Sequence, residues 1–240
     1  MGKVLGYAAF FFTFETIKNL LLMKRFFLLV AFLAIIPASL FAQDGNVDVS
    51  KWDAAIFRGP VVEAYPHYVR GTACLNSSEF QKEMVVYNRK LYYNVKLNLD
   101  VFRDIVCVMV PESTIEMVLD SPLVESFTLN GKEFVNASGV EGLERSFYEK
   151  LYGGGNMLLK ETVKKYHRVD KGNVEFYSTV KYFLVKDGKA ARVKGMKAFK
   201  KLYPEKKKVL RKYRIELSHT DQDLNNEMLY IALAKFADNS

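Results

Sequence analysis

The alternation of apolar and polar residues between positions 68 and 194 constrains the fold more than any other feature of this chain. In residues 91–99 every odd-numbered position is apolar: Leu91, Tyr93, Val95, Leu97 and Leu99. The positions between them are Tyr92, Asn94, Lys96 and Asn98. Successive side chains of a β-strand point to opposite faces, so this period of two predicts a strand with one buried face. About ten short segments of this kind are expected in residues 68–194.

Short polar turns join these segments. Asn130-Gly131 and Asp187-Gly188 are pairs that tolerate the positive φ angles of a type I′ hairpin turn. Residues 88–90 separate two further segments, 84–87 and 91–99, in the same way. The regular spacing predicts a mainly β fold, an antiparallel meander that forms a β-sandwich or barrel.

Three consecutive glycines at positions 153–155 look like a phosphate-binding loop in composition alone. Such a loop requires a following Lys-Ser/Thr pair and a helix, whereas Asn156, Met157 and Leu158 follow here. We therefore interpret the glycines as a turn between the strands 146–152 and 157–163.

Near residue 197 the apolar residues cease to alternate with polar ones and begin to recur at the spacing of a helix. One helix is expected where Val209, Leu210, Tyr213 and Leu217 recur. Thr220 is the expected N-cap of a second helix, whose apolar stripe would be Leu224, Met228, Ile231, Ala232 and Phe236. The chain is thus expected to be α+β overall, with about two helices in residues 197–240 packed on a β domain of residues 67–196. Residues 43–66 are expected to form a polar N-terminal arm.

Residues 23–42 have the order of a secretory signal peptide. Lys24 and Arg25 form a basic start, residues 26–36 are an unbroken apolar run, and Pro37 precedes small side chains. Cleavage after Ala42 would leave Gln43 as the first residue, and residues 1–22 would be an extension from a mis-assigned start. The alternatives are a membrane-anchoring helix, which needs roughly 20 apolar residues, and a second hydrophobic segment upstream.

Several longer segments support an exported address. These are FRGPVVEAYPHYVRGTACL, VVYNRKLYYNVKLNLD, VESFTLNGKEFV, RSFYEKLYGGGNMLLKE and YFLVKDGKAARVKG. Together they resemble a family of exported proteins of unassigned function that is common in Gram-negative bacteria of the Bacteroidetes type. The resemblance implies the periplasm or the outer-membrane periphery, and it supplies no active site to carry over.

A cluster of positive charge is the most distinctive electrostatic feature. Residues 186–214 contain thirteen Lys or Arg residues against Asp187 and Glu205. We define the basic face as Lys200, Lys201, Lys206, Lys207, Lys208, Arg211 and Lys212. It is either an anion-binding surface, for an envelope protein or an anionic lipid in peripheral membrane contact, or a solvated helix face. Export argues against a nucleic-acid partner.

No catalytic, cofactor or metal motif is present in the sequence. His67, His167 and His219 are far apart and lack zinc-ligand spacing, and no Gly-x-Ser-x-Gly elbow occurs. Cys74 and Cys107 are either a disulfide pair formed after export or two small buried side chains.

Asp100 and Asp104 lie near strand ends, where they either line a mouth or belong to a solvated loop. With no catalytic constellation, the sequence predicts a non-enzymatic binding or interaction protein of the envelope, without a cofactor. The alternative is a β-barrel carrier of a small apolar ligand such as a lipid.

The export prediction can be tested by intact-mass analysis of the protein recovered from fractionated host cells. We expect a chain that begins at Gln43 in the periplasmic or outer-membrane fraction, because the apolar run is shorter than a span and precedes small residues. A chain that begins at Met1 or Met23 in the inner-membrane fraction would contradict it.

Overall fold

The computed structural model of this chain describes residues 47–48, 55–66, 68–170, 173–220 and 224–239, all within one compact unit, Gly45–Ser240. The predicted signal peptide (23–42) and the upstream residues 1–22 lie outside the described residues. The strands are β1 (Val47–Asp48), β2 (Val69–Arg70), β3 (Gln81–Tyr87), β4 (Lys90–Asp100), β5 (Ile105–Met109), β6 (Glu116–Val118), β7 (Val124–Leu129), β8 (Lys132–Asn136), β9 (Phe147–Gly153), β10 (Met157–Arg168), β11 (Val174–Lys186) and β12 (Lys189–Val193). The helices are η2 (Ala55–Phe57), η3 (Ser121–Leu123), α2 (Met196–Leu202), η4 (Pro204–Lys206), α3 (Lys207–Thr220) and α4 (Asn226–Asn239).

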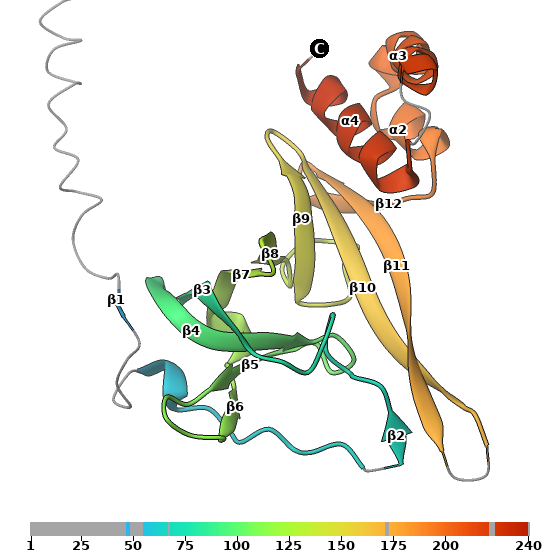
Figure 1. Cartoon of the computed structure of the whole chain (residues 1–240). Helices are drawn as coiled ribbons and strands as arrows, with labels where there is room; N and C mark the ends of the chain where they lie inside the picture. The colour runs from blue at the N-terminus through green and yellow to red at the C-terminus, as the bar shows by residue number, and fades with distance from the viewer. Residues whose placement is uncertain (1–46, 49–54, 67, 171–172, 221–223, 240) are drawn as a thin grey trace, which may run out of the picture. The chain divides into compact units, whose positions relative to one another are not determined.

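All described strands belong to one sheet, with the order β12-β11-β10-β9-β8-β7-β3-β4-β5-β6 (Figure 1). Neighbours along this path are antiparallel, whereas β1 on β4 and β2 on β11 pair in parallel and make the sheet mixed. The mainly β prediction with C-terminal helices is confirmed, because strands account for 44% of the structure. The sheet is not closed into a barrel, and three C-terminal α-helices replace the two expected.

The type I′ turns are where the sequence places them. Asn130 and Gly131 have φ angles of 54° and 72°, and Asp187 and Gly188 have 51° and 74°. The turn between β3 and β4 also has positive φ at both central positions, although it uses Asn88 and Arg89 without a glycine. These hairpins fix the register of the sheet locally.

A bulge in β4 shifts the buried face predicted from the period of two. Asn94 has a φ of 59°, and the β3–β4 register slips between Glu83 and Val85. A bulge inserts one extra residue, so the alternation changes phase across it. Val95, Leu97 and Leu99 are buried as predicted; on the other side of the bulge Tyr92 is buried, whereas its neighbours Leu91 and Tyr93 are only half-buried.

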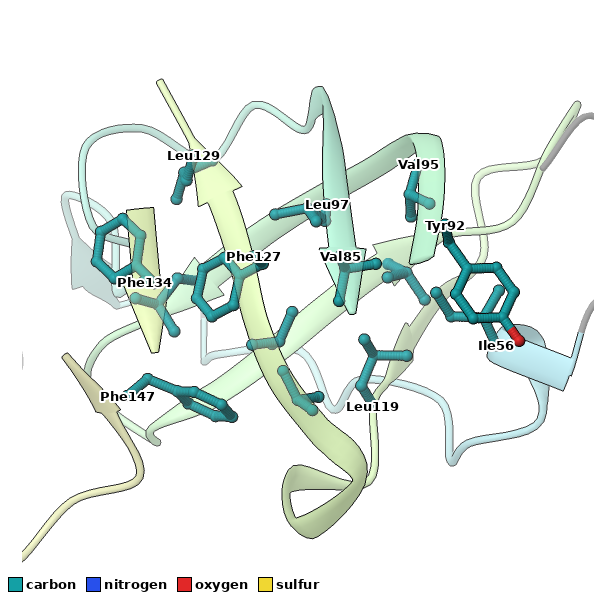
Figure 2. Packing of buried hydrophobic residues seen from close by; sticks show 14 of the residues in the cluster. Ile56, Val85, Tyr92, Val95, Leu97, Leu119, Phe127, Leu129, Phe134 and Phe147 are labelled. Atoms are coloured by element: carbon teal, nitrogen blue, oxygen red, sulfur yellow. The ribbon is translucent and has the colours of Figure 1, made fainter. Parts of the chain in front are cut away.

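The largest core cluster lies between β3, β4, β5, β7 and β8, where side chains from different strands point toward one another (Figure 2). Phe127 stacks on Phe134 with ring centroids 5.0 Å apart, and Phe147 meets Phe127 edge-on. Ile56 and Phe57 of η2 also belong to this cluster. The described end of the segment expected to be a polar arm therefore contributes to the core, because its apolar residues Ile56 and Phe57 are buried there.

The helical layer covers the other end of the sheet. Here α4 packs on β9 and β10, and α2 packs on β12 (Figure 1). The N-cap prediction at Thr220 is wrong, because α3 continues through Thr220 and the Asn225 side chain instead accepts the Met228 N–H at the start of α4. The buried positions of α4 are Tyr230, Leu233, Ala234 and Ala237, so the predicted stripe is also displaced. Phe236 of that stripe instead stacks on Tyr213 of α3.

The last turn of α4 is fastened to the glycine turn between β9 and β10. The Asp238 carboxylate accepts hydrogen bonds from the Gly155 N–H (2.8 Å), the Tyr152 hydroxyl (2.9 Å) and the Asn156 amide (2.7 Å). A Cβ atom at Gly154 would lie 2.2 Å from Asp238 Oδ2. The turn interpretation is confirmed for Gly154 and Gly155, whereas Gly153 ends β9. Close approach to a carboxylate of the same chain explains the glycine at position 154.

The first turn of α4 is fastened to the sheet by a second carboxylate. Glu227 accepts a hydrogen bond from the Tyr182 hydroxyl and pairs with Lys160 Nζ at 2.7 Å. Burial alone would raise the pKa of Glu227, but these two partners outweigh it and hold the pKa below its ordinary value. Lys160 also contacts the buried Glu149, so charges from β9, β10 and α4 form one network.

Because of the bulge, the free energy of unfolding should depend strongly on which side chain occupies position 94. Asn94→Val should lower the free energy of unfolding by about 1–2 kcal/mol, because a β-branched residue is poorly tolerated at positive φ. Asn94→Gly should change it by no more than about 0.5 kcal/mol. Urea unfolding measures both, and Lys96→Val, an exposed position on the same strand, is the control. Equal effects of Asn94→Val and Lys96→Val would contradict the positive φ at Asn94.

Candidate functional site

The basic face extends over α2, η4 and α3. Lys200 and Lys201 lie in the last turn of α2, and Lys206 ends η4. The other members are in the first two turns of α3: Lys207, Lys208, Arg211 and Lys212. Five of the seven side chains are exposed, whereas Lys200 and Lys206 are half-buried. The structure thus brings all seven predicted residues onto neighbouring helices.

Two members of the basic face are engaged within the chain. Lys206 Nζ donates to the Ala237 carbonyl at 2.6 Å, near the C-terminal end of α4, where carbonyl groups lack intrahelical partners. Lys212 pairs with Glu216 at 3.7 Å, and because both side chains are exposed this ion pair contributes little stability. The other five have no carboxylate partner among the described residues.

A groove between α2 and α3 continues the basic face. Its volume is about 370 Å³, and its lining residues are Met196, Lys200, Arg211, Arg214, Ile215 and Ser218. Arg211, Arg214, Ile215 and Ser218 follow one another at helical spacing, so they form one stripe of α3. The groove combines three cationic side chains with an apolar floor and has no acidic residue in its lining. Arg214 was not among the predicted residues, although its spacing from Arg211 would have placed it on the same side.

A second candidate site lies on the face of β4, β5 and β6 that points away from the core. Val106 and Val108 face the core, so Cys107 between them faces the opposite way. Asn98 and Asp100 share this second face with Cys107, because Asn98 pairs with Cys107 across the two strands. Residues 60–66 and 68–80, which we call the strap, cover it. The strap pairs with β6 through Pro60 and Val62, with β11 through β2, and with the end of β4 through Ala73 and Leu75.

The strap and this second face border a cavity of about 240 Å³. Its walls include the strap residues Tyr65, Cys74 and Phe80, Asp100 and Cys107 from the sheet, Glu116 from β6 and Phe176 from β11. Tyr65, Phe102 and Phe176 form an aromatic cluster with ring centroids 5.3–6.0 Å apart. The cavity is therefore bounded by segments that are distant in sequence.

Asp100 holds the strap to the sheet. Its carboxylate, 3% exposed, accepts the Tyr65 hydroxyl at 2.6 Å and the backbone N–H groups of Phe102 and Arg103, both at 2.9 Å. Burial and the hydrogen bond to Asp100 together raise the pKa of Tyr65 far above its ordinary value. Of the two predicted alternatives, Asp100 lines a cavity, whereas Asp104 turns to another loop and accepts the Ser146 N–H at 2.6 Å.

Both cysteines line the cavity as free thiols. Cys74 bridges to Asp100 on one edge of β4, while Cys107 pairs with Asn98 on the other edge. Two strand spacings separate their Cα atoms by about 10 Å, which exceeds the roughly 7 Å that a disulfide can span. Burial raises the pKa of Cys107 to about 12 and also raises the pKa of Cys74. Of the two alternatives for the cysteines, the geometry supports small packed side chains.

The described histidines do not form a site. His167 packs against the Tyr177 ring, and His219 is exposed in the last turn of α3, while His67 lies outside the described residues. Within the described ranges, no three His, Cys, Asp or Glu side chains gather closely enough to hold a metal ion. No helix in the described part of the chain has the length and apolarity needed to cross a membrane.

Comparison with known proteins gives no relative. No protein-family model matches the chain, and no curated protein or solved structure matches it. The resemblance to an exported family therefore stays a prediction, and the function must be inferred from the geometry of the chain itself.

The buried thiols predict slow alkylation. In the folded protein near pH 8, iodoacetamide should modify Cys107 at least on the order of a thousandfold more slowly than in the unfolded chain, because a pKa near 12 leaves little thiolate. Peptide mass spectrometry after timed alkylation measures each site, with the half-buried Cys74 as internal reference. Similar rates for Cys107 in folded and denatured protein, or a Cys74–Cys107 disulfide in the folded protein, would contradict this geometry.

Proposed function

We propose that this chain is an exported, non-enzymatic binding protein of the cell envelope that attaches to an anionic lipid surface through the basic face. The observation that carries the proposal is the excess of positive charge on α2, η4 and α3. Residues 196–220 contain nine Lys or Arg residues and two carboxylates, Glu205 and Glu216. Such a concentration of positive charge attracts anionic head groups with a contribution of about 1 kcal/mol for each cation near the surface.

The limited burial of α3 supports this assignment. Only Leu210 is buried among residues 207–219, and Tyr213 and Leu217 are half-buried on the same side. The other residues of this range are exposed.

An exposed apolar side chain within the positive charge favours a lipid surface over an acidic protein. Ile215 is 47% exposed and follows Lys208 by seven residues and Arg211 by four, so the three side chains share one face of α3. Val209, 49% exposed, flanks this face. Helices that lie on membranes pair cationic residues with apolar side chains that enter the head-group boundary.

The carrier alternative has less support. It requires a closed β-barrel interior for an apolar ligand, whereas the sheet is not closed into a barrel. The cavity under the strap is also smaller than the roughly 300–1,000 Å³ of pockets for drug-sized ligands, so it could not enclose a lipid chain.

The test is co-sedimentation of the chain from Gln43 to Ser240, which contains the whole compact unit, with phosphatidylglycerol vesicles. The triple variant Lys207→Gln, Lys208→Gln, Arg211→Gln should bind roughly 100-fold more weakly, as expected for the loss of three cations near the surface. Glutamine keeps good helix propensity, so α3 should remain folded. Binding of the unsubstituted chain should weaken as salt is added.

The matched control removes the same charge elsewhere. Lys82, Lys90 and Lys96 are exposed on the β3–β4 hairpin, and their triple glutamine variant should bind the vesicles like the unsubstituted chain. Equal losses in both triple variants would indicate attraction by net charge alone and would contradict a specific face. Absence of binding to phosphatidylglycerol would leave an acidic protein as the partner and overturn the lipid assignment.

A further inference from the structure

The cavity under the strap differs in charge from the rest of this basic protein. Its lining includes three carboxylates, from Glu63, Asp100 and Glu116, and no Lys, Arg or His side chain. The chain as a whole has a formal net charge of +8. An excess of carboxylates in the lining, within a protein of opposite net charge, favours a ligand that carries positive charge.

Two of the polar groups in the cavity have no partner in the described part of the chain. Glu116 is half-buried, and no hydrogen bond or ion pair reaches its carboxylate; burial raises its pKa. Cys107 is 4% exposed, and its thiol faces the cavity without a hydrogen-bond partner. Of the two, only Cys107 is fully buried, and because buried polar groups are normally hydrogen-bonded its thiol requires an explanation. A ligand that donates hydrogen bonds would supply the missing partners.

The nearest cations are committed elsewhere. Lys164 Nζ donates to the Thr72 carbonyl at 2.6 Å, and Arg103 donates to the Glu63 carbonyl at 2.7 Å while its guanidinium lies 4.0 Å from the centre of the Tyr65 ring. Neither side chain lines the cavity. Both hold the strap in place, and neither pairs with Glu116, so this carboxylate remains available to a ligand.

The remaining walls suit the apolar body of such a ligand. Aromatic rings from Tyr65, Phe80 and Phe176 line the cavity together with Val62 and Val69. The faces of aromatic rings attract cations, and the attraction increases when the cation is removed from water. The volume of about 240 Å³ limits the ligand to a few heavy atoms.

We propose that this cavity binds a small organic amine as its ammonium ion, with the Glu116 carboxylate as counter-ion and the rings of Phe80 and Phe176 as apolar walls. The site is separate from the basic face, which lies on other elements and has the opposite charge. The inference therefore stands whether or not the chain attaches to lipid.

The experiment is a calorimetric titration of the chain from Gln43 to Ser240 with three probes of matched size: n-butylammonium, 1-butanol and butyrate. We expect saturable binding of n-butylammonium and none of butyrate, with 1-butanol weaker by roughly 10- to 100-fold, the usual range for a charge-assisted hydrogen bond. Glu116→Gln should weaken n-butylammonium binding by a similar factor, because the amide keeps the shape and removes the charge.

Glu112→Gln is the matched control. Glu112 lies on the turn between β5 and β6, is exposed and does not line the cavity, so this variant should bind n-butylammonium like the unsubstituted chain. Thermal unfolding of each variant verifies that it is folded. Equal binding of n-butylammonium and 1-butanol, an unchanged affinity in Glu116→Gln, or no binding of n-butylammonium would each overturn the proposal.

Discussion

The hydrogen bonds that converge on Asp100 are the constraint on which the second face of the sheet depends. A carboxylate buried at the end of β4 is costly unless its oxygens are hydrogen-bonded. Two backbone N–H groups of the following turn and the hydroxyl of Tyr65 meet this requirement. Because Tyr65 belongs to the strap, the requirement of one buried charge also positions the segment that covers β4, β5 and β6. The cavity exists because the strap is held here and at its two ends but does not fill the space beneath it.

Hydrogen-bonded carboxylates also hold the helical layer to the sheet, and their positions explain which helix surfaces stay exposed. Glu227 fastens the start of α4 to the sheet, and Asp238 fastens its end to the glycine turn. With both ends of α4 fixed, its buried face is committed to β9 and β10. The neighbouring helix α3 packs through a narrow stripe in which Leu210 is buried. Its cations therefore project outward, and the chain presents positive charge on its helices and negative charge beneath its strap.

Local sequence signals predicted most strands and turns. They could not predict which residues of β4 face the core on each side of the bulge, or whether the sheet closes into a barrel. Asn130-Gly131 and Asp187-Gly188 form the expected turns because their φ preferences are intrinsic. Asn94 looks the same in sequence whether it is an ordinary polar position or a bulge, and the choice depends on β3. Similarly, Thr220 and Asn225 are both good caps, and only the packing of α4 decides between them. Closure into a barrel depends on the pairing of distant edges, which no local pattern reports.

The same contrast between local patterns and contacts of distant segments explains why one candidate site could be predicted from the sequence and the other could not. The basic face consists of residues that are close in sequence, so composition and helical spacing were sufficient to find it. The structure was needed to show which of these cations already have a partner within the chain, as Lys206 has in the Ala237 carbonyl.

The cavity depends on pairing between segments that are distant in sequence. In sequence Glu116 is one acidic residue in a short strand, and Tyr65 lies in a segment expected to be a polar arm. Only when the strap lies across β4 does Glu116, which has no partner among the described residues, line a cavity with aromatic walls. Partial burial there raises the pKa of Glu116, so the surroundings that the fold provides, more than residue identity, make this a site.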